Sequence, residues 1–323
     1  MDIRRRNENG RRAFTLIELL VVIAILGLLI SILVPSIAGA KELANRVICQ
    51  SHLHGAGNGI QLYTSEYSNW LAGPNTSGLH LSVDYGSYDG DDVTDVTEPT
   101  QNMDWISPTM GVELGLTNER SDRLVEIFNT ALRCPSNKDY YDGEYTGGGD
   151  GELDDIDALS LRVSSYSAAL GFHVIGDNQV TMPMQVTEVT EARSLWEIPG
   201  GYLPKLSLVG DAERKVYAMD GARYVDDAGS VTFNMFMRQL RGGNFMLYGP
   251  ATALGGDPYR YEERNGEWVP TPTGARYAYR HRGEMNVVYF DGHAGSLSVE
   301  DSWQAELFFP TGTESAFTDE ELP

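Results

Sequence analysis

The sequence predicts an α+β protein in which a long N-terminal helix packs on a globular head built on an antiparallel sheet. Two patterns predict the helix. Residues 14–34 are apolar and contain one charged side chain, Glu18, and apolar residues then recur at three- and four-residue steps from Ile37 to Tyr67. A third pattern predicts the sheet, because β-branched and aromatic residues mix with turn residues from Leu159 onwards.

The apolar stretch is long enough to cross a membrane. At about 1.5 Å of rise per residue, a helix over residues 14–34 is about 31 Å long, close to the ~30 Å of bilayer hydrocarbon. Five arginines precede the stretch and the next one is Arg46, so the positive-inside bias places the N-terminus in the cytoplasm and exports residues 36–323. A carboxylate such as Glu18 is costly inside a bilayer, which predicts a function and a partner for it.

The start of this stretch resembles the type III signal of type IV pilins and type II secretion pseudopilins. The matching residues are Arg11-Arg12-Ala13 followed by Phe14-Thr15-Leu16-Ile17-Glu18-Leu19. The resemblance implies that a prepilin peptidase cuts between Ala13 and Phe14 and methylates Phe14. It also implies that Glu18 pairs with the new amine of a neighbouring subunit, and that Pro35 kinks the helix. The family usually has Gly in place of Ala13. A plain signal anchor is the alternative, since the run is too long for a cleaved signal peptide.

Beyond Pro35 the predicted helix continues to about Tyr67 as an amphipathic spine. The predicted apolar stripe comprises Ile37, Ala40, Ala44, Val47/Ile48, Ala56, Ile60, Tyr63 and Tyr67. The run Gly55-Ala56-Gly57-Asn58-Gly59 has two interpretations, close packing against a sheet or local melting, because each Gly costs about 1 kcal/mol relative to Ala in a helix. Further on, residues 121–132 predict a short helix capped by Ser121 and ended by Pro135.

The segment Tyr277–Val299 predicts a hairpin, in which a strand over 286–290 meets a returning strand over 294–299 at the turn Asp291-Gly292. Nine residues separate His281 from Asp291. This spacing resembles the H-x9-D-G element that accompanies prepilin signals in a pseudopilin-like family abundant in planctomycete- and verrucomicrobia-type bacteria. Other fragments that fit this family are Cys49, Gln61-Leu62-Tyr63, Cys134-Pro135-Ser136 and Ser165-Tyr166-Ser167. For His281, Asp291 and His293 we favour a structural role over metal binding or catalysis.

The two cysteines, Cys49 and Cys134, have two interpretations. Export favours a disulfide, and the alternative is two separate buried thiols. The spacing Cys49-x-x-His52-x-His54 does not favour a metal site, because His52 and His54 lie about 200° apart around a helix.

The head is strongly acidic. Without residues 1–13, which hold five Arg and two acids, the chain has 19 basic and 44 acidic residues and a formal charge of −25. This excess excludes nucleic acid as a partner, because such binding depends on Lys and Arg. Two Gly- and Asp-rich loops could supply oxygen ligands to calcium or form a solvated surface. Their candidate ligands are Asp84, Asp89, Asp91, Asp150 and Asp154. Calcium is the one cofactor the sequence suggests.

These observations divide the chain into a leader (1–13), a transmembrane assembly helix (14–35), an amphipathic spine (36–70), an exported head (71–310) and an acidic tail (311–323). No G-x-S-x-G, H-E-x-x-H or P-loop occurs, and we expect no enzyme. The resemblance implies a structural subunit of a pilus or secretion pseudopilus in the inner membrane, with an exported head. Its implied partners are prepilin peptidase, other subunits and the inner-membrane assembly platform. The alternative is a membrane-anchored module that binds calcium or a surface polymer.

Overall fold

The computed structural model describes residues 15–72, 95–98, 104–140, 143–144, 160–173, 196–221, 232–233, 245–246, 261–264, 267–270 and 278–315. Ala13, Phe14 and the five candidate calcium ligands lie outside these ranges, as do residues 316–323 of the predicted tail. The chain divides into two compact units, residues 1–44 and 45–323. Helix α1 (Leu16–Glu66) is continuous and belongs to both units, because the boundary between the units falls between Ala44 and Asn45.

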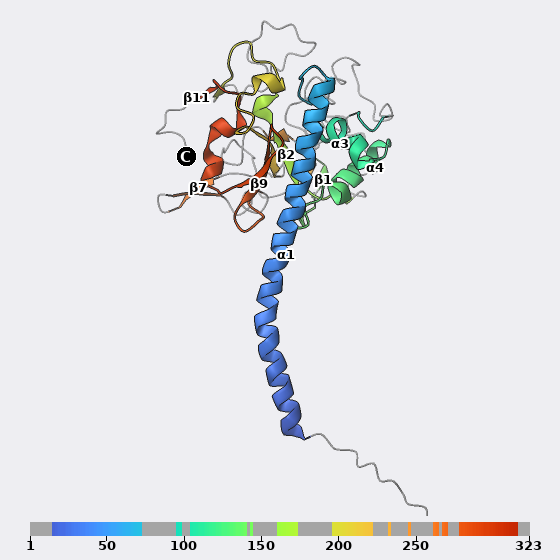
Figure 1. Cartoon of the computed structure of the whole chain (residues 1–323), viewed down its shortest axis with the longest axis vertical. Helices are drawn as coiled ribbons and strands as arrows, with labels where there is room; N and C mark the ends of the chain where they lie inside the picture. Colours follow the sequence, from blue (N-terminus) through green and yellow to red (C-terminus); the bar gives the residue numbers. More distant parts are fainter. Residues whose placement is uncertain are drawn as a thin grey trace, which may run out of the picture. The chain divides into compact units, whose positions relative to one another are not determined.

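In the first unit, α1 forms the membrane-type helix that the sequence predicts (Figure 1). Pro35 lies inside it, and the helical conformation runs through this residue without a break. Proline cannot donate the backbone hydrogen bond to the residue four positions earlier, which is Ser31. The predicted kink at Pro35 stays a prediction.

In the second unit, α1 contributes a stripe of side chains to the head's core. Its buried apolar members are Cys49, Leu53, Ala56, Ile60 and Tyr63. These positions follow one another at steps of four and three residues, which places them on one face of the helix. The prediction was wrong for most of its members, because only Ala56, Ile60 and Tyr63 are buried. The exposed members are Ile37, Ala40, Ala44, Val47, Ile48 and Tyr67. The buried stripe runs through Cys49 and Leu53, and Val47 lies on a different face of the helix.

The helix does not melt at the run from Gly55 to Gly59, and its glycines pack closely against the head. A Cβ on Gly57 would lie 2.8 Å from Val288 Cγ2 and 2.9 Å from Gly292 Cα. A Cβ on Gly59 would lie 2.6 Å from the carbonyl oxygen of Thr109. Normal carbon–carbon contacts are about 3.5–4.0 Å, so these two positions admit only glycine without movement of the neighbouring backbone. The helix continues through them because this close approach buries its face.

The head is organised by a five-stranded sheet in the order β10-β9-β4-β2-β6. Its strands are β2 (Tyr166–Ala169), β4 (Val216–Asp220), β6 (Phe245–Met246), β9 (Met285–Tyr289) and β10 (Ala294–Leu297). The first four strands in this order pair antiparallel, as predicted, and the edge strand β6 pairs parallel to β2. The predicted C-terminal hairpin is confirmed, with Ala294 opposite Val288 and Gly292 at a φ of 94° that favours glycine.

Side chains of α1 fasten it to this hairpin. Arg46 donates hydrogen bonds to the Glu284 carboxylate and to Ser296 Oγ, and Gln50 also reaches Ser296 Oγ at 3.2 Å. Nearer the end of the helix, Gln61 donates to the carbonyl oxygen of Phe290. The second half of α1 is therefore a structural part of the head (Figure 1).

Short elements complete the described head. The helical ones are α3 (Ile106–Leu114), α4 (Arg120–Val125), the π-helix η2 (Glu126–Ala131) and the 3-10 turns η3 (Leu170–Phe172), η4 (Leu206–Leu208), η5 (Asp301–Trp303) and η6 (Ala305–Phe308). The paired strands outside the main sheet are β1 (Gly143–Glu144) with β5 (Thr232–Phe233), β3 (Trp196–Glu197) with β11 (Glu314–Ser315), and β7 (Tyr261–Arg264) with β8 (Glu267–Pro270).

Two local predictions were wrong. The helix predicted over 121–132 is split into α4 and η2, and its cap is Glu119, whose side chain accepts a hydrogen bond from the backbone N–H of Asp122 at 2.7 Å. A carboxylate near a helix N-terminus satisfies a free N–H as Ser would. Within the region from Leu159 onwards that predicted strands, residues 207–213 instead form the end of η4 and a turn, where Gly210 has a φ of 102°.

Candidate functional site

The first candidate site is the apolar surface of α1 over residues 16–34. Every residue in this range is exposed, including Leu16 at 81% and Leu28 at 64%. A helix that is apolar on all sides needs lipid or other helices around it. Among the described residues, this is the one helix that is long and apolar enough to cross a membrane.

Glu18 closes a capping box at the start of this helix. Its carboxylate accepts hydrogen bonds from the backbone N–H of Thr15 at 2.8 Å and from the Thr15 hydroxyl at 2.9 Å. In return, the Thr15 hydroxyl accepts from the Glu18 N–H at 3.2 Å. This reciprocal pair satisfies two groups that a helix N-terminus leaves free. An intersubunit role was predicted for Glu18 from the sequence, but helix capping was not. The T-x-x-E pattern before an apolar run is the sequence signal for a capping box.

The second candidate site is a buried cluster of Cys49, Cys134 and His281. A ligand atom from each residue lies within 4.8 Å of the other two, and all three side chains have no exposed surface. Cys134 Sγ is 3.4 Å from His281 Nε2. Both cysteines are free thiols, but the structure brings them together, which the predicted disulfide requires. That disulfide stays a prediction.

Asp220, at the end of β4, borders the cluster. Its Oδ2 lies 3.8 Å from His281 Nε2 and accepts a hydrogen bond from the backbone N–H of Asn286 at 2.8 Å. Its Oδ1 pairs with Arg280 Nη2 at 3.1 Å. Burial raises the pKa of Asp220 to about 6, while Arg280 opposes that shift. Sequence reasoning missed both Asp220 and Arg280.

One of the two thiols loses its proton more easily than both do, because the thiol that keeps its proton can donate a hydrogen bond to the other sulfur. A hydrogen bond from the Cys49 thiol lowers the pKa of Cys134, and Arg280 and His281 add to this lowering. The same hydrogen bond, together with burial, raises the pKa of Cys49. The cluster therefore favours Cys134 as its anionic member, as is typical of a cysteine beside cationic groups.

Further polar groups surround the cluster. Ser165 Oγ accepts hydrogen bonds from the backbone N–H of Cys134 and from Asn137 Nδ2, both at 3.0 Å, and Arg280 donates to the Ser165 carbonyl oxygen. The hydroxyl of Tyr166 lies 3.0 Å from His52 Nδ1. Three of the scattered fragments noted in the sequence, around Cys49, Cys134 and Ser165-Tyr166, thus meet at His281.

His281 and Asp291 do not form the single site that their spacing suggested. His281 pairs with Glu284 just before β9, and Asp291 follows that strand. The five residues of β9 separate them by about 16 Å at 3.3 Å per residue. Asp291 instead contacts His293 Nδ1 at 2.6 Å on the exposed turn. The carboxylate beside His281 is Asp220 and not Asp291. The structural role predicted for His281, Asp291 and His293 stays a prediction.

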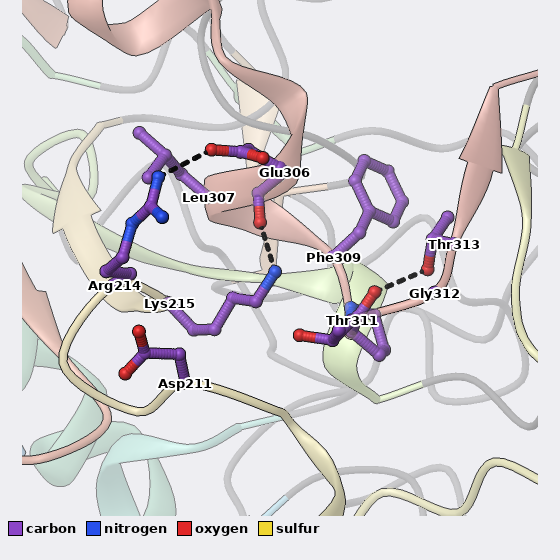
Figure 2. Close-up of a pocket in the computed structure, with 10 residues that line it drawn as sticks. Asp211, Arg214, Lys215, Glu306, Leu307, Phe309, Thr311, Gly312 and Thr313 are labelled. Carbon is purple, nitrogen blue, oxygen red and sulfur yellow. Dashed lines mark hydrogen bonds and ion pairs between the residues drawn. The ribbon is translucent and has the colours of Figure 1, made fainter.

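A surface hollow of about 470 Å³ lies elsewhere, between the turn before β4 and the C-terminal segment (Figure 2). Its lining residues are Asp211, Arg214, Lys215, Glu306, Leu307, Phe309, Pro310, Thr311, Gly312 and Thr313. Lys215 donates to the Glu306 carbonyl oxygen at 2.6 Å, and Arg214 to the Glu306 carboxylate at 2.8 Å. Neither His281 nor Asp291 lines this hollow, so it gives a hydrolase reaction at those residues no support.

One family model matches the N-terminal part of the chain. Residues 9–34 match the family described as "Prokaryotic N-terminal methylation motif". The chain is 40% identical over 60 residues to the type II secretion system core protein G of Klebsiella pneumoniae, a match that covers 19% of this chain and 43% of that protein. It is 35% identical over 67 residues to the type IV wide pilus major component PilA4 of Thermus thermophilus, with coverage of 21% and 49%. No solved structure matches the chain.

The chain thus spans less than half the length of these two curated relatives. The motif includes the predicted cleavage position after Ala13, the Glu18 capping box and the exposed apolar helix. Residues 9–34 carry a prokaryotic N-terminal methylation motif, on a helix whose apolar surface this chain alone does not cover.

Proposed function

We propose that this chain is a structural subunit of a pilus or of a type II secretion-like pseudopilus. In this proposal a prepilin peptidase cuts between Ala13 and Phe14 and methylates Phe14, and the mature chain is held in the inner membrane with its head exported. The apolar surface of residues 16–34 then passes from lipid to neighbouring subunits during assembly. The proposal assigns the chain no enzymatic activity.

One observation carries the proposal: the methylation motif includes the helical segment 16–34, whose apolar side chains are all exposed in the single chain. Burying such a surface is favourable by about 25 cal/mol per Å². Lipid and a bundle of identical helices both offer that burial, so the segment is stable in either place. The rest of α1 is fixed to the head by Arg46, Gln50 and Gln61, so the exposed part is the portion free to engage neighbours.

The mature N-terminus tests the processing step. The full chain is expressed in a host with its prepilin peptidase and in the same host without it, and the N-terminal peptide is identified by mass spectrometry. We expect a chain that begins at methylated Phe14 only when the peptidase is present. A chain that keeps Arg11 and Arg12 in both hosts would make the protein an ordinary membrane-anchored one.

Glu18 tests the assembly step, and Thr15 provides its matched control. In Glu18→Gln the capping box survives, because Gln closes it as well as Glu, but the charge that would meet a neighbour's amine is lost. In Thr15→Ala the charge remains and the capping box is lost. We expect Glu18→Gln subunits to be largely excluded from filaments, and Thr15→Ala subunits to enter them at close to the wild-type level. Filament content relative to the membrane pool is measured by immunoblotting.

The reverse pattern assigns Glu18 to helix capping alone. If Glu18→Gln enters filaments like the wild type while Thr15→Ala does not, the intersubunit pairing is excluded. The processing result does not depend on this outcome, because the mature N-terminus is read from the membrane pool.

A further inference from the structure

We propose that Cys49, Cys134 and His281, with Asp220 as a fourth ligand, form a structural zinc site that joins the N-terminal helix to the head. Thiolate and imidazole ligands are typical of zinc. The cluster lies beyond residues 9–34, so the methylation motif does not include it. The proposal is independent of the pilus or pseudopilus role.

The distances among the donor atoms fit a tetrahedral ion. Zinc binds Cys sulfur at about 2.3 Å and His nitrogen at about 2.0–2.1 Å, so a sulfur and a nitrogen on one tetrahedral zinc lie about 3.6 Å apart. Cys134 Sγ and His281 Nε2 are 3.4 Å apart, and the three donor atoms of the cluster all lie within 4.8 Å of one another. The side chains therefore need only small movements to bind a common ion.

Asp220 approaches the same nitrogen of His281 that faces Cys134. Its Oδ2 is 3.8 Å from His281 Nε2, against about 3.3 Å expected for two ligands of one tetrahedral zinc with bonds of about 2.0 Å. A carboxylate that only oriented the imidazole would approach the other ring nitrogen. Oδ2 accepts one backbone hydrogen bond, from Asn286, and each carboxylate oxygen has two acceptor positions. Among the described residues Asn286 is the one hydrogen-bond donor to Oδ2, so the second position is available to a metal.

The charges of the site balance when zinc is present. Two thiolates neutralise the ion, and Arg280 neutralises Asp220 through the contact at 3.1 Å. This balance matters because the side chains of Asp220, Arg280 and His281 are at most 3% exposed, and an uncompensated buried charge is costly.

The ligands come from four separate parts of the chain. Cys49 is the first fully buried residue of α1, Cys134 follows η2, Asp220 ends β4 and His281 precedes β9. Because the ligands of a structural zinc site must be deprotonated and gathered, binding free energy becomes folding free energy. A zinc ion here would fix α1 to the sheet at the point where the helix enters the core.

The test uses the full chain in detergent, purified from membranes without reductant or chelator. Metal content is measured by mass spectrometry, thiols are counted after unfolding, and zinc is replaced by Co²⁺. We expect about one zinc per chain, two titratable thiols, and the sulfur-to-cobalt charge-transfer and tetrahedral d–d absorption bands of thiolate-bound Co²⁺. His281→Gln should lose most of the d–d intensity. His54→Gln, at an exposed histidine of α1, should keep it.

Two results on the wild-type chain overturn the proposal. One is a Cys49–Cys134 disulfide in the chain taken directly from membranes, seen as no free thiol and a mass lower by two hydrogens. The other is wild-type chain with free thiols that neither contains zinc nor gives the cobalt bands. Both are read on the wild type, so they hold even if His281→Gln fails to fold. Unchanged bands in a folded His281→Gln variant would remove His281 from the ligand set and overturn the site as described.

Discussion

Gly57 offers the sharpest test of how α1 packs on the head. In Gly57→Ala the new Cβ meets Val288 Cγ2 at 2.8 Å and Gly292 Cα at 2.9 Å, about 0.7 Å inside the closest normal carbon–carbon contact. Gly292 cannot easily withdraw, because its φ of 94° fixes the hairpin turn. Overpacking of this kind costs about 1–3 kcal/mol. The substitution also gains about 1 kcal/mol of helix propensity, so we expect a net loss of up to about 2 kcal/mol.

Gly55→Ala is the matched control on the same helix. Its Cβ would meet only Met110 Cε, at 3.3 Å, and this flexible side-chain end can move. The propensity gain should therefore dominate, and Gly55→Ala should be more stable than Gly57→Ala by about 2 kcal/mol. Urea unfolding of the full chain in detergent, followed by tryptophan fluorescence, measures the difference. A Gly57→Ala variant as stable as Gly55→Ala would refute the proposed close approach of helix and hairpin.

Two further predictions concern the head. Arg123 is fully buried and donates hydrogen bonds to the backbone carbonyls of Asp95, Val96, Glu98, Thr117 and Asn118. Arg123→Met should lower the free energy of unfolding by about 3–5 kcal/mol, since buried polar groups lose their partners. Arg214→Met, at an arginine whose side chain is 63% exposed, is the surface control. A loss below about 1 kcal/mol in Arg123→Met would show that the carbonyls find water. Burial lowers the pKa of His173 to about 3, whereas the pKa of a histidine in the unfolded chain is about 6.5. Below about pH 6.5 the unfolded state therefore binds more protons than the folded state. The free energy of unfolding should fall as the pH drops from about 6.5 towards about 3. Between pH 7.5 and pH 5 the wild type should lose about 2 kcal/mol more than His173→Gln, and parallel slopes in urea titrations would contradict this.

The parts of the fold that were predictable depend on local sequence. The hairpin was predictable because Asp291-Gly292 is a strong turn signal between two apolar runs. The membrane-type helix was predictable from its composition. The stripe on α1 was only partly predictable, because Val47 and Ile48 are as apolar as Leu53, and only the partner surface decides which face is buried.

The buried cluster was not predictable, because its members are far apart in the chain. Cys134 and His281 are 147 residues apart, and no periodic pattern states that such residues meet. Asp220 also gave no signal, since an aspartate at the end of an apolar strand is common. The H-x9-D-G spacing suggested one site, but a strand of five residues separates its two halves. The capping role of Glu18 was predictable from the T-x-x-E pattern of Thr15 and Glu18. The prediction made for Glu18 was based instead on the cost of a carboxylate in lipid.

The fastening of α1 to the C-terminal hairpin determines when the head can finish folding. Arg46 bonds to Glu284 across 238 residues of sequence, and Gln61 to Phe290 across 229. Contacts at such separations form late, because a long loop must close first. The N-terminal helix therefore leaves the ribosome while the strands that its second half packs against are still unmade. Until those strands are in place, the apolar stripe from Cys49 to Tyr63 is uncovered. In the topology proposed above, this interval lasts until the last strands have crossed the membrane, and during it the chain is most exposed to proteases.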